Sequence, residues 1–294
     1  MIRFLLALLL IPLAACATAR EPAAPAFASD RISVEVIGSG PDVVLIPGLS
    51  SSPRIWASTI AAMPGYRYHV VHVAGFASKG AGANASGPVV EPVAEEIARY
   101  IKEAGLKKPA IIGHSLGGAW AIMIAGRHPE LASKVMVVDM LPFFGAMFGG
   151  PAATPESVRP IAEQIRTGIA TSTGEARQKQ IEQTIAGMVR TEALRREIVE
   201  QSLASDPVVS GQAMYELITS DLRPDLARIK VPLTVLFVRP AGAPVTDAQM
   251  EQFYARSYAN APQAVLKRIP DSYHFIMLDA PEAFRRELAL FLSR

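Results

Sequence analysis

The chain has 294 residues, of which 50% are hydrophobic and 19% charged, so we expect a large buried core and exclude a disordered protein. The formal net charge of +2, with no Lys/Arg cluster interleaved with aromatic side chains, argues against a nucleic-acid partner. This length suits either one large α/β domain with an inserted element or two small domains.

The N-terminus has the pattern of a bacterial export signal. Arg3 supplies a positive charge, and the apolar run that follows is too short for a membrane span. The run ends in Leu13-Ala14-Ala15-Cys16, which resembles a lipobox, so we assign residues 1–16 to a lipoprotein-type signal peptide that is cut before Cys16, after which the cysteine is lipidated. An ordinary signal peptide with an incidental Cys16 is the alternative. We expect a periplasmic or cell-envelope lipoprotein of a bacterium that contacts the membrane through Cys16, with residues 17–30, rich in Ala and Pro, as its tether.

Strand and helix patterns alternate along most of the rest of the chain. Strands are expected at 32–37, 42–46, 66–73, 109–113, 135–139, 232–238 and 264–269, and helices at 53–63, 89–104, 116–127, 246–259 and 281–292. This alternation predicts an α/β fold with a doubly wound, mostly parallel sheet. It stops between the fifth and sixth strands, where helical patterns dominate. We therefore expect a core of residues 31–139 and 229–294, with a helical cap of residues 140–228 inserted between strands.

The run Gly113-His114-Ser115-Leu116-Gly117 joins a buried strand to a helix over very few residues. Such a sharp turn has little room for side chains beside its tip, and the tip residue projects its hydroxyl away from the backbone. A glycine-flanked serine on its own is often only a flexible turn. Its position between strand and helix favours a nucleophile elbow with Ser115 as the nucleophile.

A serine hydroxyl needs a base, and His274 is the best placed of the five histidines. It follows the last strand, and loops at the carboxyl ends of parallel strands share one edge of the sheet. His274 can therefore meet Ser115 there and act as general base. The alternative is a structural role, in which His274 is a loop histidine whose hydrogen bonds are satisfied by the fold.

Three stretches resemble the α/β-hydrolase superfamily: Gly113–Gly118, Ile46–Leu49 and Tyr273–Phe275. The chain order, with serine before a histidine near the end, also resembles that superfamily. The resemblance covers nearly all of residues 31–294. It implies an oxyanion hole formed by the backbone N–H groups of Leu49 and Leu116. Pro47-Gly48 stands where many relatives have His-Gly, so a plain turn is the alternative there.

The resemblance implies a triad acid, for which two residues compete. Relatives most often place it after the strand that is here 232–238, but Asp247 comes late in that loop and suits the first turn of a helix. The other placement known in the superfamily is the end of the strand after the elbow helix, where Asp139 stands. We favour Asp139, which would fix His274 and stabilise its charge; a mere cap of the next segment is its alternative role.

The apolar segment Met140–Phe148 follows Asp139 directly. If it is helical, Leu141, Phe144 and Phe148 share a face and form an apolar wall of the substrate pocket. Docking of the cap on the core is an equally good explanation of these side chains. Trp56 and Met214 are further candidate wall residues. The cap would limit substrate size and exclude water.

These features predict a serine hydrolase that cleaves a small-molecule carboxylic ester through Ser115, His274 and Asp139. The mechanism needs no metal or organic cofactor. Amidase, lactonase and perhydrolase variants of the fold stay open, as does a lipase that acts on the membrane to which it is tethered. The alternative from another class is a lipid-anchored binding or scaffolding protein on a degenerate hydrolase fold, since the usual acid position after Val238 lacks a carboxylate.

Overall fold

The computed structural model describes residues 27–240 and 242–293. The predicted signal peptide, Cys16 and residues 17–26 of the predicted tether lie outside the described residues. No helix within the described ranges is long and apolar enough to cross a membrane.

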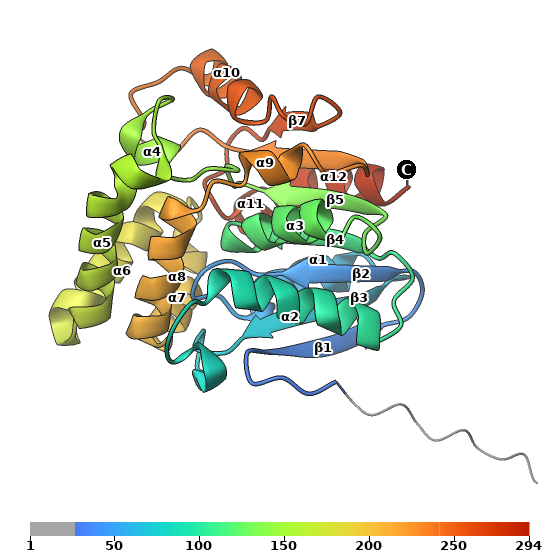
Figure 1. Ribbon diagram of the computed structural model, residues 1–294, viewed down its shortest axis with the longest axis horizontal. Coiled ribbons are helices and arrows are strands. Elements are labelled where there is room, and N and C mark those ends of the chain that lie inside the picture. Colours follow the sequence, from blue (N-terminus) through green and yellow to red (C-terminus); the bar gives the residue numbers. More distant parts are fainter. Residues whose placement is uncertain (1–26, 241, 294) are drawn as a thin grey trace, which may run out of the picture.

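A seven-stranded sheet runs through the molecule in the order β1-β3-β2-β4-β5-β6-β7 (Figure 1). Only β1 is antiparallel to its neighbour, and the other pairs are parallel. The strands are β1 Ile32–Gly38, β2 Asp42–Ile46, β3 Arg67–Val73, β4 Ala110–His114, β5 Lys134–Val138, β6 Leu233–Phe237 and β7 Val265–Arg268. The predicted doubly wound α/β fold is confirmed.

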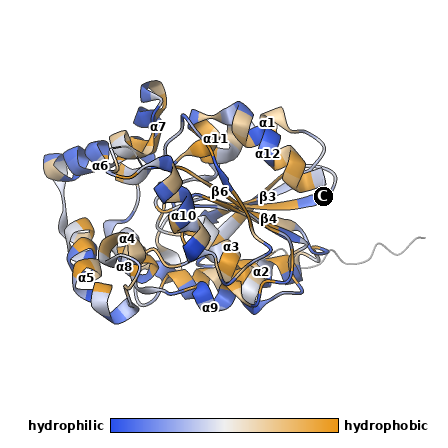
Figure 2. Cartoon of the chain, turned by 90° about the horizontal axis from the view of Figure 1, so that it is seen from above, coloured by the Kyte–Doolittle hydropathy of each residue, from blue (hydrophilic) through white to orange (hydrophobic). Residues whose placement is uncertain are grey.

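Helices cover both faces of the sheet (Figure 2). One face carries α2 (Val90–Glu103), α3 (Leu116–Arg127), α9 (Arg223–Leu226) and α10 (Asp247–Ser257), and the other carries η1 (Pro53–Trp56), α1 (Ala57–Ala62), α11 (Ile276–Asp279) and α12 (Pro281–Ser293). Successive strand residues point to opposite faces, so Val44 and Ile111 join one core and Leu45 and Ile112 the other. Strands buried on both faces explain the continuous apolar runs in the sequence.

Most of the helices between β5 and β6 form a group beside the carboxyl ends of the strands (Figure 1). They are α4 (Ala146–Gly149), α5 (Pro155–Thr171), α6 (Gly174–Met188), α7 (Glu192–Leu203) and α8 (Pro207–Thr219). Glu216 of α8 accepts hydrogen bonds from the N–H groups of Val89 and Val90, at the start of α2. A carboxylate at this position satisfies free helix donors and also fastens the helical insertion to the core.

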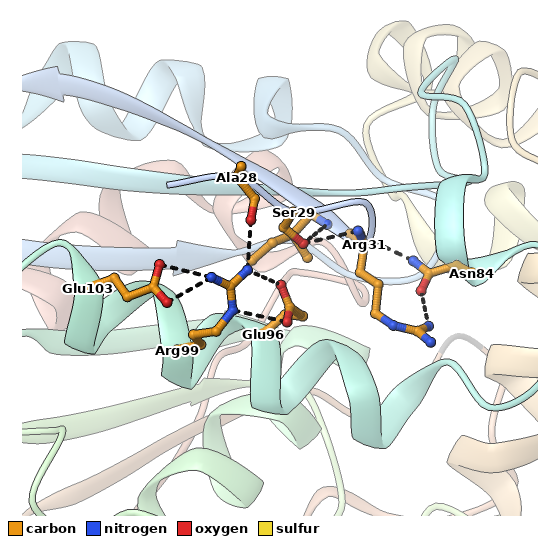
Figure 3. Close-up of polar contacts among 8 residues, drawn as sticks. Ala28, Ser29, Arg31, Asn84, Glu96, Arg99 and Glu103 are labelled. Carbon is orange, nitrogen blue, oxygen red and sulfur yellow. Dashed lines mark hydrogen bonds and ion pairs between the residues drawn. The ribbon is translucent and has the colours of Figure 1, made fainter. Parts of the chain in front are cut away.

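The segment before β1 is attached to the last turns of α2 (Figure 3). The ring of Phe27 packs edge-on against Tyr100 with centroids 5.1 Å apart, and the Arg99 guanidinium lies 4.5 Å from the Phe27 ring centroid. Arg99 also donates to the carbonyl of Ala28 and to the carboxylate of Glu96. The first described residues therefore lie at the C-terminal end of α2, whereas Glu216 lies at its N-terminal end.

A last small 3-10 helix, η2 (Gly82–Asn84), lies in the loop after β3. The buried side chain of Asn84 donates to the carbonyls of Arg31 and Ala74 and accepts from the Arg31 guanidinium (Figure 3). This residue ties the start of β1 to the end of β3, which stabilises the antiparallel edge of the sheet.

Candidate active site

Ser115 lies at the tip of the turn between β4 and α3, with a backbone φ of 54° and ψ of −125°. A Cβ on Gly113 would lie 2.0 Å from the Gly117 carbonyl oxygen, and a Cβ on Gly117 would lie 2.2 Å from that of Ile46. Only glycine fits at these two positions. The positive φ of a non-glycine residue is strained, and such strain is typical of functional sites.

His274 and Asp139 are hydrogen-bonded to each other beside this turn. His274 Nδ1 lies 2.6 Å from Asp139 Oδ2, and their side chains are 20% and 10% exposed. Asp139 directly follows β5, and His274 lies between β7 and α11. The two residues meet because the carboxyl ends of parallel strands share one edge of the sheet.

The other carboxylate oxygen of Asp139 is held by two donors. Oδ1 accepts from the N–H of Val238 at 3.0 Å and from the hydroxyl of Tyr254 at 3.1 Å. Burial, together with the Asp139 charge, raises the pKa of Tyr254 well above its usual range, so the hydroxyl stays protonated as a donor. Tyr254 is fixed by stacking on Phe237, with ring centroids 4.0 Å apart.

Asp247, the competing acid, lies elsewhere. It is in the first turn of α10 and is 49% exposed. Its carboxylate pairs with Arg239 at 2.8 Å and Arg268 at 3.0 Å, and has no contact with His274. Its position is that of an acidic residue at a helix N-terminus.

The loop after β2 passes directly against Ser115, because a Cβ on Gly48 would lie 2.9 Å from the Ser115 Cβ. Within the described ranges, the N–H groups of Leu49 and Leu116 have no hydrogen-bond acceptor. The Leu116 side chain is buried, so only its backbone can serve the site. Two free donors beside the serine hydroxyl are what an oxyanion hole requires.

Ser115 and His274 line the same cavity without a hydrogen bond between them. Such bonds are often long in a free enzyme and shorten when substrate binds.

His114 packs beneath the His274 loop. Its Nε2–H donates to the backbone carbonyl of His274 at 3.1 Å, and the two imidazole centroids are 4.7 Å apart. Burial first, and the charge of His274 second, hold the pKa of His114 well below its usual range. His114 is therefore neutral, with its proton on Nε2.

This burial predicts a loss of stability in mild acid. The unfolded state gains a proton on His114 below a pH of about 6.5, whereas the folded state does not, so the unfolding free energy falls as pH falls. The slope per proton is about 1.4 kcal/mol per pH unit. Urea unfolding between pH 7 and 5 should show a shallower dependence in His114→Gln, which keeps a donor, than in the parent or His128→Gln. If the unfolding free energy depended equally on pH in all three proteins, His114 would not be the source of the acid sensitivity.

A cavity of about 690 Å³ opens over Ser115 and His274. Its walls come from the loop at Leu49, the segment after Asp139, and α5 to α8. They are mostly apolar, with Leu141, Phe144 and Phe148 among the lining residues, as predicted from sequence, and Met214 as well. Phe148 is also 44% exposed, so it stands at the entrance of the cavity.

The structure corrects two expectations. Trp56 does not line the cavity; it is fully buried in the core beside Phe284. The segment 140–148 is not one helix, because only Ala146–Gly149 is helical. Leu141, Phe144 and Phe148 reach the cavity from an irregular turn and this short helix.

The sequence analysis missed Tyr254. The only available signal was the spacing Met250-Tyr254-Tyr258, which puts three large side chains on one face of α10. All three are buried, and the Tyr258 hydroxyl donates to the carbonyl of Met140. This spacing predicts an inward face but not which carboxylate that face would contact.

We expect Tyr254→Phe to lower kcat about tenfold without raising KM, because it removes a hydrogen bond to the carboxylate that orients His274. The control is Tyr258→Phe, which loses a hydroxyl one turn further along α10. Steady-state kinetics on a short p-nitrophenyl ester measure both. Equal kcat values in the two variants would show that the Asp139–Tyr254 bond does not orient the pair.

A doubly wound sheet with a strained serine after one central strand, and a histidine–aspartate pair at the same edge, is the arrangement of the nucleophile-elbow hydrolases. The chain belongs to the α/β-hydrolase family: residues 43–287 match the profile described as "Alpha/beta hydrolase family".

Similar proteins agree with this membership. The pimeloyl-[acyl-carrier protein] methyl ester esterase of Pectobacterium carotovorum is 26% identical over 260 residues, which cover 85% of this chain and 93% of the relative. Among solved structures, an esterase from Exiguobacterium antarcticum superposes with a TM-score of 0.74 at 21% identity, covering 90% of this chain and 96% of the other. An enol-lactonase from Burkholderia xenovorans does so with a TM-score of 0.70 at 20% identity and the same coverage.

Proposed function

We propose that the protein is a serine hydrolase that cleaves small-molecule carboxylic esters. The observation that carries this proposal is the meeting of Ser115, the His274–Asp139 pair and Leu49 at one wall of a cavity, with the free backbone N–H of Leu116 directly after Ser115 in the chain. Relatives along most of the chain are named as methyl ester esterases, which supports the same reaction class.

In the proposed mechanism, Ser115 Oγ attacks the ester carbonyl while His274 Nε2 accepts its proton. Asp139 fixes the tautomer in which Nδ1 carries a proton, and it stabilises the imidazolium that forms. The developing oxyanion takes hydrogen bonds from Leu49 and Leu116, and loss of one such donor costs about 3 kcal/mol of transition-state stabilisation. His274 then protonates the leaving alcohol, and water releases the acyl group from Ser115.

A panel of acyl chain lengths and bond types tests this function. We expect turnover of p-nitrophenyl esters and of methyl esters, and turnover of matched anilides at least 100-fold slower. An anilide or a lactone hydrolysed faster than every ester would assign the site to an amidase or a lactonase. Preference for emulsified long-chain triglyceride over soluble esters would favour the lipase alternative.

The degenerate-scaffold alternative has lost its main support. That support was the absence of a carboxylate soon after Val238, and Asp139 contacts His274 from the neighbouring strand instead. Relatives most often place the acid after the strand that is here β6. In this chain the end of that strand instead supplies a backbone donor, since the N–H of Val238 bonds to Asp139.

We further propose that residues 1–16 direct export and that Cys16 carries the lipid anchor. The support is the sequence Leu13-Ala14-Ala15-Cys16 at the end of a short apolar run. In a bacterial host, the full chain should incorporate radioactive palmitate and sediment with membranes, whereas Cys16→Ser should do neither. Unlabelled parent protein would contradict the anchor.

A further inference from the structure

The substrate cavity contains a single cationic side chain. Among the described residues that line it, Arg177 is the only Lys or Arg, and Asp139, engaged with His274, is the only Asp or Glu. Arg177 belongs to the first turn of α6. It therefore places a permanent positive charge in a mostly apolar wall, apart from the contact between Asp139 and His274.

Arg177 is only partly used by the fold. Its Nη2 donates to the carbonyls of Ser205, at 2.7 Å, and Ser202, at 3.3 Å, just beyond and within the last turn of α7. Its Nε–H and Nη1–H groups have no acceptor in the described part of the chain, and no carboxylate there lies within ion-pair distance. A guanidinium has five N–H donors, so the larger part of its donor capacity stays free.

Arg177 is anchored beside the loop that carries Leu49. Ser205, whose carbonyl accepts from the guanidinium, has its Oγ 2.9 Å from the carbonyl of Gln201 and 3.3 Å from the carbonyl of Ser50. Ser50 directly follows Leu49, the proposed oxyanion donor. The turn after α7 therefore contacts both the guanidinium and the loop that would bind the ester oxygen.

We propose that Arg177 binds a carboxylate carried by the substrate, so that the preferred substrates are esters with an anionic group remote from the bond that is cleaved. This inference rests on the proposed ester hydrolysis and names its substrate class. A hydrogen bond between a guanidinium and a carboxylate is assisted by their opposite charges, and apolar surroundings strengthen the attraction relative to water. Because Nη2 is engaged with the carbonyls of Ser205 and Ser202, the carboxylate would accept from the Nη1–H donors that the fold leaves free.

The test uses substrates that differ only in charge. One series is the monomethyl esters of dicarboxylic acids with four to eight carbons. Each is paired with the analogue in which a carboxamide replaces the free carboxylate. The second series is acetate esters of ω-hydroxy acids paired with their amides, which moves the carboxylate to the alcohol side. The readout is the ratio of kcat/KM for carboxylate over carboxamide.

In at least one series the parent ratio should exceed about ten, fall toward one in Arg177→Gln, and decrease with added salt. Arg195→Gln is the matched control. Within the described ranges Arg195 also donates only to backbone carbonyls, those of Val189 and Arg190, and it does not line the cavity. A parent ratio near one in both series, or a ratio that Arg177→Gln leaves unchanged, would overturn the proposal. A purely structural Arg177 would lower both rates without changing their ratio.

A binding measurement separates this inference from the proposed function. In Ser115→Ala, calorimetry should give tighter binding of the carboxylate ester than of its carboxamide, and the difference should vanish in Ser115→Ala/Arg177→Gln. If the parent hydrolyses no ester while this binding preference persists, the reaction class fails and the anion site stands. If esters are hydrolysed without any binding preference, the anion site fails alone.

Discussion

Asp139→Asn should lower kcat for a short p-nitrophenyl ester by about 10⁴-fold, whereas Asp247→Asn should stay within about twofold of the parent. The introduced carboxamide would still accept from Val238 and Tyr254, but it would present its NH₂ group to Nδ1 of His274. The imidazole would then be held in the tautomer that protonates Nε2, which cannot accept the proton of Ser115. Asp247 pairs with two surface arginines and has no part in this contact.

Both variants should keep the parent circular dichroism spectrum and unfold in the same urea range within about 2 kcal/mol. The comparison then isolates the contact with His274 from general destabilisation. Parent-like activity in Asp139→Asn, or a large loss only in Asp247→Asn, would reverse the assignment of the acid.

Ser115→Ala should abolish turnover, with a fall in kcat of about 10⁶-fold. The variant keeps the cavity, the oxyanion donors and the His274–Asp139 pair but lacks the attacking oxygen. Ser172→Ala is the control, because Ser172 also lines the cavity and lies at the end of α5, away from the elbow. Residual turnover above about one per cent in Ser115→Ala, measured on freshly purified protein, would mean that another group performs the attack.

The parts of the site that depend on local sequence were predictable. The elbow needs a strand, two glycines and a helix within a short stretch, and each of these has a strong local signal. His274 was predictable because parallel strands bring their following loops to one edge. Because the hydrophobic patterns of strands and helices are also local, the predicted strands and the main helices of the core agree with the observed elements to within two residues at each end.

The placement of the acid needed the folded structure. Asp139 and Asp247 both stand near carboxyl ends of strands, and their difference lies in contacts between distant residues: Asp139 with His274, 135 positions away, and Asp247 with Arg268. The support from Tyr254 depends on how α10 packs against the sheet. The spacing of the large side chains predicts which face of α10 points inward, but it does not predict that the Tyr254 hydroxyl contacts Asp139.

Trp56 and Phe148 show a second limit of the sequence. Both are large and apolar, and hydropathy does not distinguish a side chain in a closed core from one at a cavity entrance. The fold places Trp56 against Phe284 with no exposed surface, whereas Phe148 is 44% exposed on a short helix. The difference comes from tertiary packing, which a sequence pattern does not encode position by position.

The central claim is that Ser115 is a nucleophile activated by His274 and Asp139. Treatment with a fluorophosphonate, followed by intact mass measurement and peptide mapping, tests it most directly, because this reagent modifies activated serines. We predict a single adduct on Ser115 in the parent, a much slower one in Asp139→Asn, and none in Ser115→Ala. Equal labelling of the parent and Ser115→Ala, or an adduct confined to another residue, would contradict the account.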